Sequence, residues 1–183
     1  MTVYTELKVV GLKEALKEVQ KIDKSLRRQF TRDYKQIVKP VVDDAVRTVK
    51  ALPAAPLSGF ARSWELGNKQ VLPWDTDAAA KQIKPHINTR AVKQYAGRDV
   101  NLSVFTIKFL GVANTIFATA GRSSTGSTES GRQMIKVLRE RYGPPVRVLW
   151  PAYEKHAEQV NKNIEVLVER IMKAANRRLV AER

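Results

Sequence analysis

Seven basic residues recur along the first long amphipathic segment, mostly three or four residues apart. At 100° per residue they lie within an arc of roughly 80°, nearly opposite the apolar side chains of the same segment. Such a face could bind the phosphates of double-stranded DNA or the acidic surface of a protein partner. A solvated helix face is the commoner role for charges in this pattern, so both interpretations stay open. This predicted basic face consists of Lys13, Lys17, Lys21, Lys24, Arg28, Lys35 and Lys39.

A second candidate lies between Gly121 and Thr128, where G-R-S-S-T-G-S-T has the glycine spacing of a phosphate-binding loop. Ser127 occupies the position of the lysine that would contact the β- and γ-phosphates. No strand–helix–strand succession surrounds the segment. Because small polar residues dominate from Gly121 to Gly131, the sequence favours a mobile polar loop over a nucleotide site.

No arrangement of residues indicates catalysis or metal binding. His86 and His156 each lack a second ligand at metal-binding spacing, and His156 is expected to be a solvated surface residue. Asp75 and Asp77 form an isolated D-x-D, which suits a turn or a helix cap better than a calcium loop. No pairing of a nucleophile with a base is visible. The sequence therefore predicts no enzyme, no metal site and no cofactor.

Composition narrows the class of protein. The chain has 183 residues, 33 basic and 18 acidic, which gives a net charge of +15. This balance favours contact with nucleic acid or an acidic protein surface. There is no cysteine, so disulfides and thiolate metal sites are excluded. No apolar stretch approaches the roughly 20 residues of a membrane span, and no signal-peptide pattern opens the chain.

Helical periodicity brackets the chain at both ends. A short strand is predicted within Thr2–Val10, and a helix from Leu12 to Val49 that Pro40 should kink or split. The last helix is expected to run for roughly 30 residues after an extended segment over Val146–Trp150, with Pro151 in its first turn. Its apolar stripe comprises Tyr153, Ala157, Val160, Ile164, Leu167, Ile171, Ala175 and Leu179.

The middle of the chain predicts shorter elements. Leu52–Gly59 is expected to be a turn, and Phe60–Leu72 a strand. Asn101–Leu110 and Val112–Ala120 predict the two strands of a hairpin. Ser130–Tyr142 predicts a helix that Gly143-Pro144-Pro145 ends. Extended loops are expected at 73–97, with one short helical turn, and at 121–131. No linker divides the chain, so one domain over 1–183 is predicted.

The order of these segments resembles the tail-completion family of long-tailed bacteriophages, whose members join the head connector to the tail. Val9-Val10-Gly11-Leu12 resembles the family's strand, Gly-Leu and long basic helix. Ala45–Ser63 resembles its helix end, proline, (S/T)-G and Arg-Ser. Leu149-Trp150-Pro151-Ala152-Tyr153-Glu154 resembles the start of its terminal helix. Thr119-Ala120-Gly121-Arg122 departs from the Glu-Phe-Gly-Thr-like end of the family's second hairpin strand.

The resemblance implies an α+β fold, with a small antiparallel β-sheet packed with a long N-terminal helix and a long C-terminal helix. It implies a structural virion protein of the neck, assembled in the host cytoplasm into a homo-oligomeric ring of six copies. Expected partners are a head-side connector or stopper protein, a tail-side terminator or tube protein, and double-stranded DNA in the channel, with no membrane. The candidate inter-ring loop comprises Arg122, Ser123, Ser124, Thr125, Gly126, Ser127, Thr128 and Glu129.

Two alternatives remain at this point. A tail terminator or another ring protein of the neck is the nearest one. A basic nucleic-acid-binding protein outside phage biology is the second, although Trp64, Trp74 and Trp150 lie away from the predicted basic face.

Overall fold

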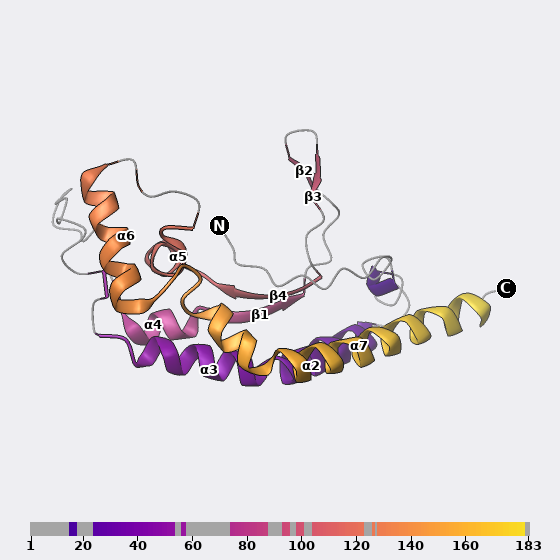
Figure 1. The fold of residues 1–183 in the computed structure, drawn as a ribbon. Coiled ribbons are helices and arrows are strands. Elements are labelled where there is room, and N and C mark those ends of the chain that lie inside the picture. The colour runs from indigo at the N-terminus through magenta and orange to yellow at the C-terminus, as the bar shows by residue number, and fades with distance from the viewer. Residues whose placement is uncertain are drawn as a thin grey trace. The chain divides into compact units, whose positions relative to one another are not determined.

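The computed structural model describes residues 15–17, 24–53, 56–57, 74–87, 93–95, 98–100, 104–122, 126 and 128–181. Figure 1 traces their elements in chain order from indigo to yellow. These elements are α2 (Lys24–Ile37), α3 (Lys39–Lys50), α4 (Thr76–Lys81), β1 (Ile83–Ile87), β2 (Lys93–Tyr95), β3 (Arg98–Val100), β4 (Phe105–Phe109), α5 (Val112–Thr119), α6 (Glu129–Tyr142) and α7 (Leu149–Ala181).

The described residues belong to two units, each of which has buried apolar side chains of its own. Unit 1 draws on Val41–Lys84 and Lys108–Lys155, and unit 2 on Tyr4–Pro40, Pro85–Ile107 and His156–Arg183.

Unit 2 is built around the apolar faces of α2 and α7. The α2 residues Phe30 and Tyr34 are buried, as is Leu16 in the helical turn at 15–17. Along α7, apolar side chains recur at steps of three or four residues, which places them on one helix face. The buried α7 residues of this unit are Val160, Ile164, Leu167, Val168, Ile171 and Ala175.

Unit 1 combines α3, α4, α5, α6 and the first turns of α7. Val41, Ala45 and Val49 bury one face of α3. Phe117 of α5 lies edge-on to Trp74 and to Tyr142 of α6, with ring centroids 5.4 and 5.2 Å apart. These aromatic contacts connect α5 and α6 to the segment that leads into α4.

The described strands form two small sheets. β1 pairs with β4, and β2 pairs with β3 in an antiparallel register of Lys93 opposite Val100. The Leu110 N–H donates to the Gln82 carbonyl, and the Thr106 hydroxyl donates to the His86 carbonyl. Residue numbers increase from Gln82 to His86 while those of their partners decrease from Leu110 to Thr106, so β1 and β4 are antiparallel.

The structure confirms the expected α+β class, with a small antiparallel sheet and long helices near both ends. The predicted split at Pro40 is also confirmed, because the helix is interrupted at Val38 and resumes as α3. Pro40 has no N–H to donate to the carbonyl four residues earlier. The predicted helix over Ser130–Tyr142 is confirmed as α6, which Gly143 ends with a positive φ of 81°.

One predicted strand is wrong. Val112–Ala120 was expected to be the second strand of a hairpin, but Val112–Thr119 forms α5. Gly111, with φ of 104°, starts this helix, and the Asn114 side chain donates to the Leu110 carbonyl at 2.6 Å. Phe117 and Ala118 are buried together with Asn114, at spacings of three and four residues. The β-branched residues of this short segment favour a strand, but the segment forms a helix because the helix buries these three side chains on one face.

The segment expected to be an extended loop at 73–97 instead holds α4, β1 and β2, although its short helical turn is confirmed as α4. Asp75 caps α4 by accepting a hydrogen bond from the Ala78 N–H at 2.6 Å, as a helix cap was expected to do. Leu149 and Trp150 were expected to be extended but already belong to α7, with Pro151 in the first turn. The strands expected in Thr2–Val10 and Phe60–Leu72 lie outside the described residues.

Candidate interaction surface

Three exposed cations form a row along α2, which we call the α2 basic row: Arg28, Arg32 and Lys35. Their spacing of four and then three residues places them within an arc of about 60° on a helix of 3.6 residues per turn. Lys39 is exposed at the start of α3, another four residues on. Among the described residues, no carboxylate forms an ion pair with Arg28, Arg32 or Lys35.

The side of α2 opposite the α2 basic row packs against β4. Tyr34 is 2% exposed, its ring stacks on Phe105 of β4 at 4.8 Å, and its hydroxyl donates to the Thr106 carbonyl at 2.9 Å. Burial raises the pKa of the Tyr34 hydroxyl well above its usual value. Because this face of α2 is buried against β4, the basic row on the far side faces outward.

Asp33 is the only acidic residue of α2, and it does not neutralise the row. Its Oδ2 lies 3.2 Å from the Arg170 guanidinium of α7. At 100° per residue, Asp33 lies about 100° or more away from each residue of the row. The helix therefore presents its cations and its carboxylate on different sides.

The structure places the predicted basic face only in part. Arg28, Lys35 and Lys39 are exposed, and Lys17 is half-buried. Lys13 and Lys21 lie outside the described residues, and Lys24 begins α2 with no side chain described. Arg32 was missed by the sequence reasoning. The spacing could have revealed it, because Arg28 and Lys35 are seven residues apart and Arg32 lies between them, four residues after the first and three before the second.

The candidate inter-ring loop is shorter than expected. Thr128 caps α6, its hydroxyl accepting from the Gly131 N–H at 3.1 Å, and Glu129 is the first residue of that helix. Gly126 packs against the backbone of Gly131 and Arg132, where a Cβ would lie only 2.8 Å from other atoms. Arg122 is exposed, and Ser123, Ser124, Thr125 and Ser127 lie outside the described residues. The segment follows α5 rather than a strand, so it lacks the context of a phosphate-binding loop.

A second basic row has the same spacing on α6, and we call it the α6 basic row: Arg132, Lys136 and Arg139. All three residues are exposed. Here a carboxylate lies beside the cations, since Glu129 Oε2 is 2.8 Å from the Arg132 guanidinium. The α6 basic row is therefore partly neutralised, unlike the α2 basic row.

Arg147 is a buried cation that joins the ends of two helices in unit 1. It is 5% exposed. Its Nη1 donates to the Phe117 carbonyl at 2.8 Å, Nη1 and Nη2 donate to the Ala120 carbonyl at 3.2 and 3.3 Å, and Nε donates to the Gly143 carbonyl at 3.0 Å. These carbonyls lie at the C-terminal ends of α5 and α6, where the helix dipole is negative. Burial, and then the nearby Arg139, lower the pKa of Arg147.

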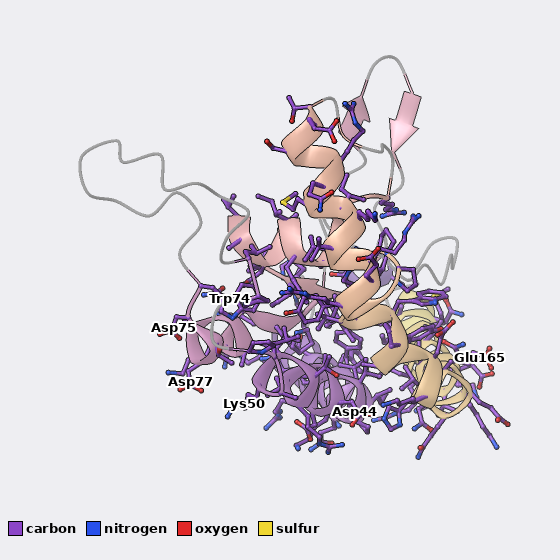
Figure 2. All side chains as sticks on the ribbon, turned by 60° about the vertical axis from the view of Figure 1, so that its left-hand side comes forward. Asp44, Lys50, Trp74, Asp75, Asp77 and Glu165 are labelled. Atoms are coloured by element: carbon purple, nitrogen blue, oxygen red, sulfur yellow. The ribbon has the colours of Figure 1, made fainter. Side chains whose placement is uncertain are left out.

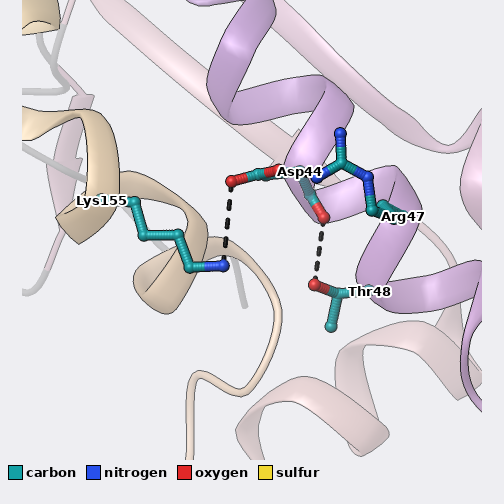
Figure 3. A network of polar contacts seen from close by, with 4 residues as sticks. All are labelled: Asp44, Arg47, Thr48 and Lys155. Atoms are coloured by element: carbon teal, nitrogen blue, oxygen red, sulfur yellow. Dashed lines mark hydrogen bonds and ion pairs between the residues drawn. The ribbon is translucent and has the colours of Figure 1, made fainter.

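Asp44 forms a second polar cluster in unit 1, which Figure 3 shows from close by. Its side chain is 14% exposed, and its two oxygens lie 2.7 Å from Arg47 and 3.8 Å from Lys155. The Thr48 hydroxyl donates to the Asp44 carbonyl at 3.0 Å. The carboxylate therefore connects α3 to the start of α7. At the far end of α3, Lys50 lies 4.0 Å from Asp77 of α4 (Figure 2).

The terminal-helix stripe lies where the sequence placed it: Val160, Ile164, Leu167 and Ile171 are buried, and Tyr153 is half-buried. His156 is half-buried and has an interaction partner, so the expectation of a solvated histidine is wrong. In the part of the chain that the structure describes, no three His, Cys, Asp or Glu side chains gather as metal ligands. No described helix combines the length and the apolar character of a membrane span.

No protein-family model, curated protein or solved structure matches this chain.

Proposed function

We propose that the chain is a structural subunit of a phage neck, which forms a homo-oligomeric ring that joins the head connector to the tail. The order of its elements carries the proposal. An amphipathic helix interrupted at Val38 precedes a small antiparallel sheet, and the 33-residue helix α7 follows with Pro151 in its first turn. This is the layout that the resemblance to tail-completion proteins implies, and the resemblance brings no catalytic residues with it.

Exposed apolar side chains support assembly with further copies. In unit 1, Leu110, Val112 and Trp150 are 40%, 73% and 43% exposed, and in unit 2 Val166 is 52% exposed. Leu110 and Val112 flank Gly111 at the junction of β4 and α5. Burial of such side chains by a neighbouring subunit would add stability of about 25 cal/mol for each Å² removed from water. A two-stranded sheet is also marginal alone and gains stability from packing.

The mass of the purified protein tests the ring. Native mass spectrometry of the chain, alone and with head-side and tail-side neck proteins, should show a species close to six times 20.7 kDa. Electron microscopy of that species should show a closed ring. A protein that stays monomeric alone, and that also occurs as a single copy in assembled particles, would refute the proposal.

Two alternatives give different results in the same assays. A tail terminator would also form a ring, but it would bind the end of the tail tube and not the head connector. A nucleic-acid-binding protein outside the virion would bind DNA without a ring and without either neck partner, and the α2 basic row is the feature that favours it.

A further inference from the structure

The α2 basic row matches the charge spacing of a nucleic acid backbone. From Arg28 to Lys35 the helix rises about 10 Å at 1.5 Å per residue. Duplex DNA carries one negative charge per about 1.7 Å of its axis, so this length faces about six phosphate charges. Two of the three cations are arginines, whose planar guanidinium donates two parallel hydrogen bonds to a phosphate.

The residues around the row do not suit a protein partner. Its exposed neighbours on α2 are Gln29 and Gln36, and the aromatic side chains of the helix, Phe30 and Tyr34, are buried on the opposite face. The cores of protein–protein interfaces are enriched in aromatic residues and depleted of lysine. Protein–DNA interfaces are more polar and far more positive. No exposed apolar side chain lies beside the row on the described part of α2, and such a polar, cationic surface favours a polyanion.

The same residues favour double-stranded over single-stranded nucleic acid. Single-stranded binding relies on aromatic side chains on which the bases stack. Neither aromatic residue of α2 is available for stacking, because Phe30 and Tyr34 are 4% and 2% exposed. Only the phosphates remain to be contacted, and a duplex presents them at the higher density along its axis.

We infer that Arg28, Arg32 and Lys35 bind the phosphate backbone of double-stranded DNA without reading its sequence. Phosphate contacts position a protein but carry no sequence information directly. The inference rests on the proposed function in one respect, which is that a neck ring places its subunits next to the DNA that passes through. It names the partner of one surface, the α2 basic row.

The test compares two triple variants of the full chain with matched spacing and matched charge. One is Arg28→Gln, Arg32→Gln and Lys35→Gln, and the control is Arg132→Gln, Lys136→Gln and Arg139→Gln. Binding of each to a short duplex of mixed sequence is measured by fluorescence anisotropy from low to moderate salt. Each neutralised phosphate contributes about −0.9 to the slope of log K against log salt.

For the α2 variant we expect that slope to become less steep by about three. When salt is raised from about 50 to about 200 mM, the affinity of the α2 variant should therefore fall by a factor roughly 40 times smaller than the affinity of the wild-type protein. The α6 variant should keep the wild-type slope to within about one, because Glu129 already neutralises part of its row. A duplex of different sequence should give the same constants.

Three outcomes would overturn the inference. In the first, the α2 variant binds duplex as wild type does. In the second, both variants lose the same slope, which would assign binding to net charge alone. In the third, wild-type protein prefers single-stranded DNA or a polyglutamate peptide to the duplex. If the triple variant does not fold, the single variant Arg32→Gln takes its place, with an expected slope change of about one.

Failure of this inference and failure of the proposed function are distinguishable. A six-copy ring whose α2 variant binds duplex normally would overturn the inference alone. A monomer that depends on the α2 basic row for duplex binding would overturn the ring alone.

Discussion

Replacing Arg147 by alanine should destabilise unit 1 more than the loss of any exposed cation in that unit. The substitution removes the donors to the Phe117, Ala120 and Gly143 carbonyls, of which the bond to Phe117 is buried. Hydrogen bonds from charged donors contribute about 1.5–3 kcal/mol each, and an unpaired buried acceptor costs a comparable amount. Desolvation of the guanidinium and repulsion by Arg139 offset part of this. We therefore expect a loss of about 4 kcal/mol in the free energy of unfolding.

For a chain of this size, 1 kcal/mol corresponds to about 2–4 °C in Tm, so Arg147→Ala should lower Tm by roughly 12 °C. Arg147→Lys should fall between alanine and wild type, because one ammonium cannot reach the ends of both helices as a guanidinium does. Arg139→Gln is the matched control. It removes an exposed cation of α6 that repels Arg147, so it should leave Tm unchanged or slightly higher.

Calorimetry and urea titration of the four proteins measure these differences. A change of less than about 1 kcal/mol for Arg147→Ala would refute the reasoning, because it would mean that water replaces the guanidinium at all three carbonyls.

Three further predictions concern stability. The raised pKa of Tyr34 means that the unfolded chain loses this proton first, so the free energy of unfolding should fall by up to about 1.4 kcal/mol per pH unit above about pH 10. Urea midpoints should show a weaker fall for Tyr34→Phe, and an identical pH dependence would contradict the assignment. Ile164→Asp with Leu167→Asp should unfold the protein, since a buried unpaired carboxylate costs several kcal/mol, whereas Asn163→Asp, at an exposed position of the same helix, should change Tm little. Thr128→Ala should cost about 1 kcal/mol through loss of the α6 cap, and an unchanged Tm would show that the cap contributes nothing.

The helices that bracket the chain were predictable because their signals are local. Apolar residues at steps of three and four extend over several turns of α2, α3 and α7, and short-range chemistry marks where these helices break. Pro40 lacks the N–H that would continue the first helix, and Gly143 adopts the positive φ that ends α6. The same period identified Arg28, Lys35 and Lys39, which are exposed, and passed over Arg32.

The tertiary structure alone decided what the middle of the chain does. Val112–Thr119 is too short for its period to separate strand from helix, and burial of Phe117 and Ala118 settles it. The pairing of β1 with β4 joins segments more than ten residues apart, which no local pattern specifies. The sequence also contains no sign that Arg147 would be buried, because its acceptors are backbone carbonyls that every residue carries. Periodicity encodes which face of a helix is apolar, whereas the partners of that face depend on contacts between distant residues.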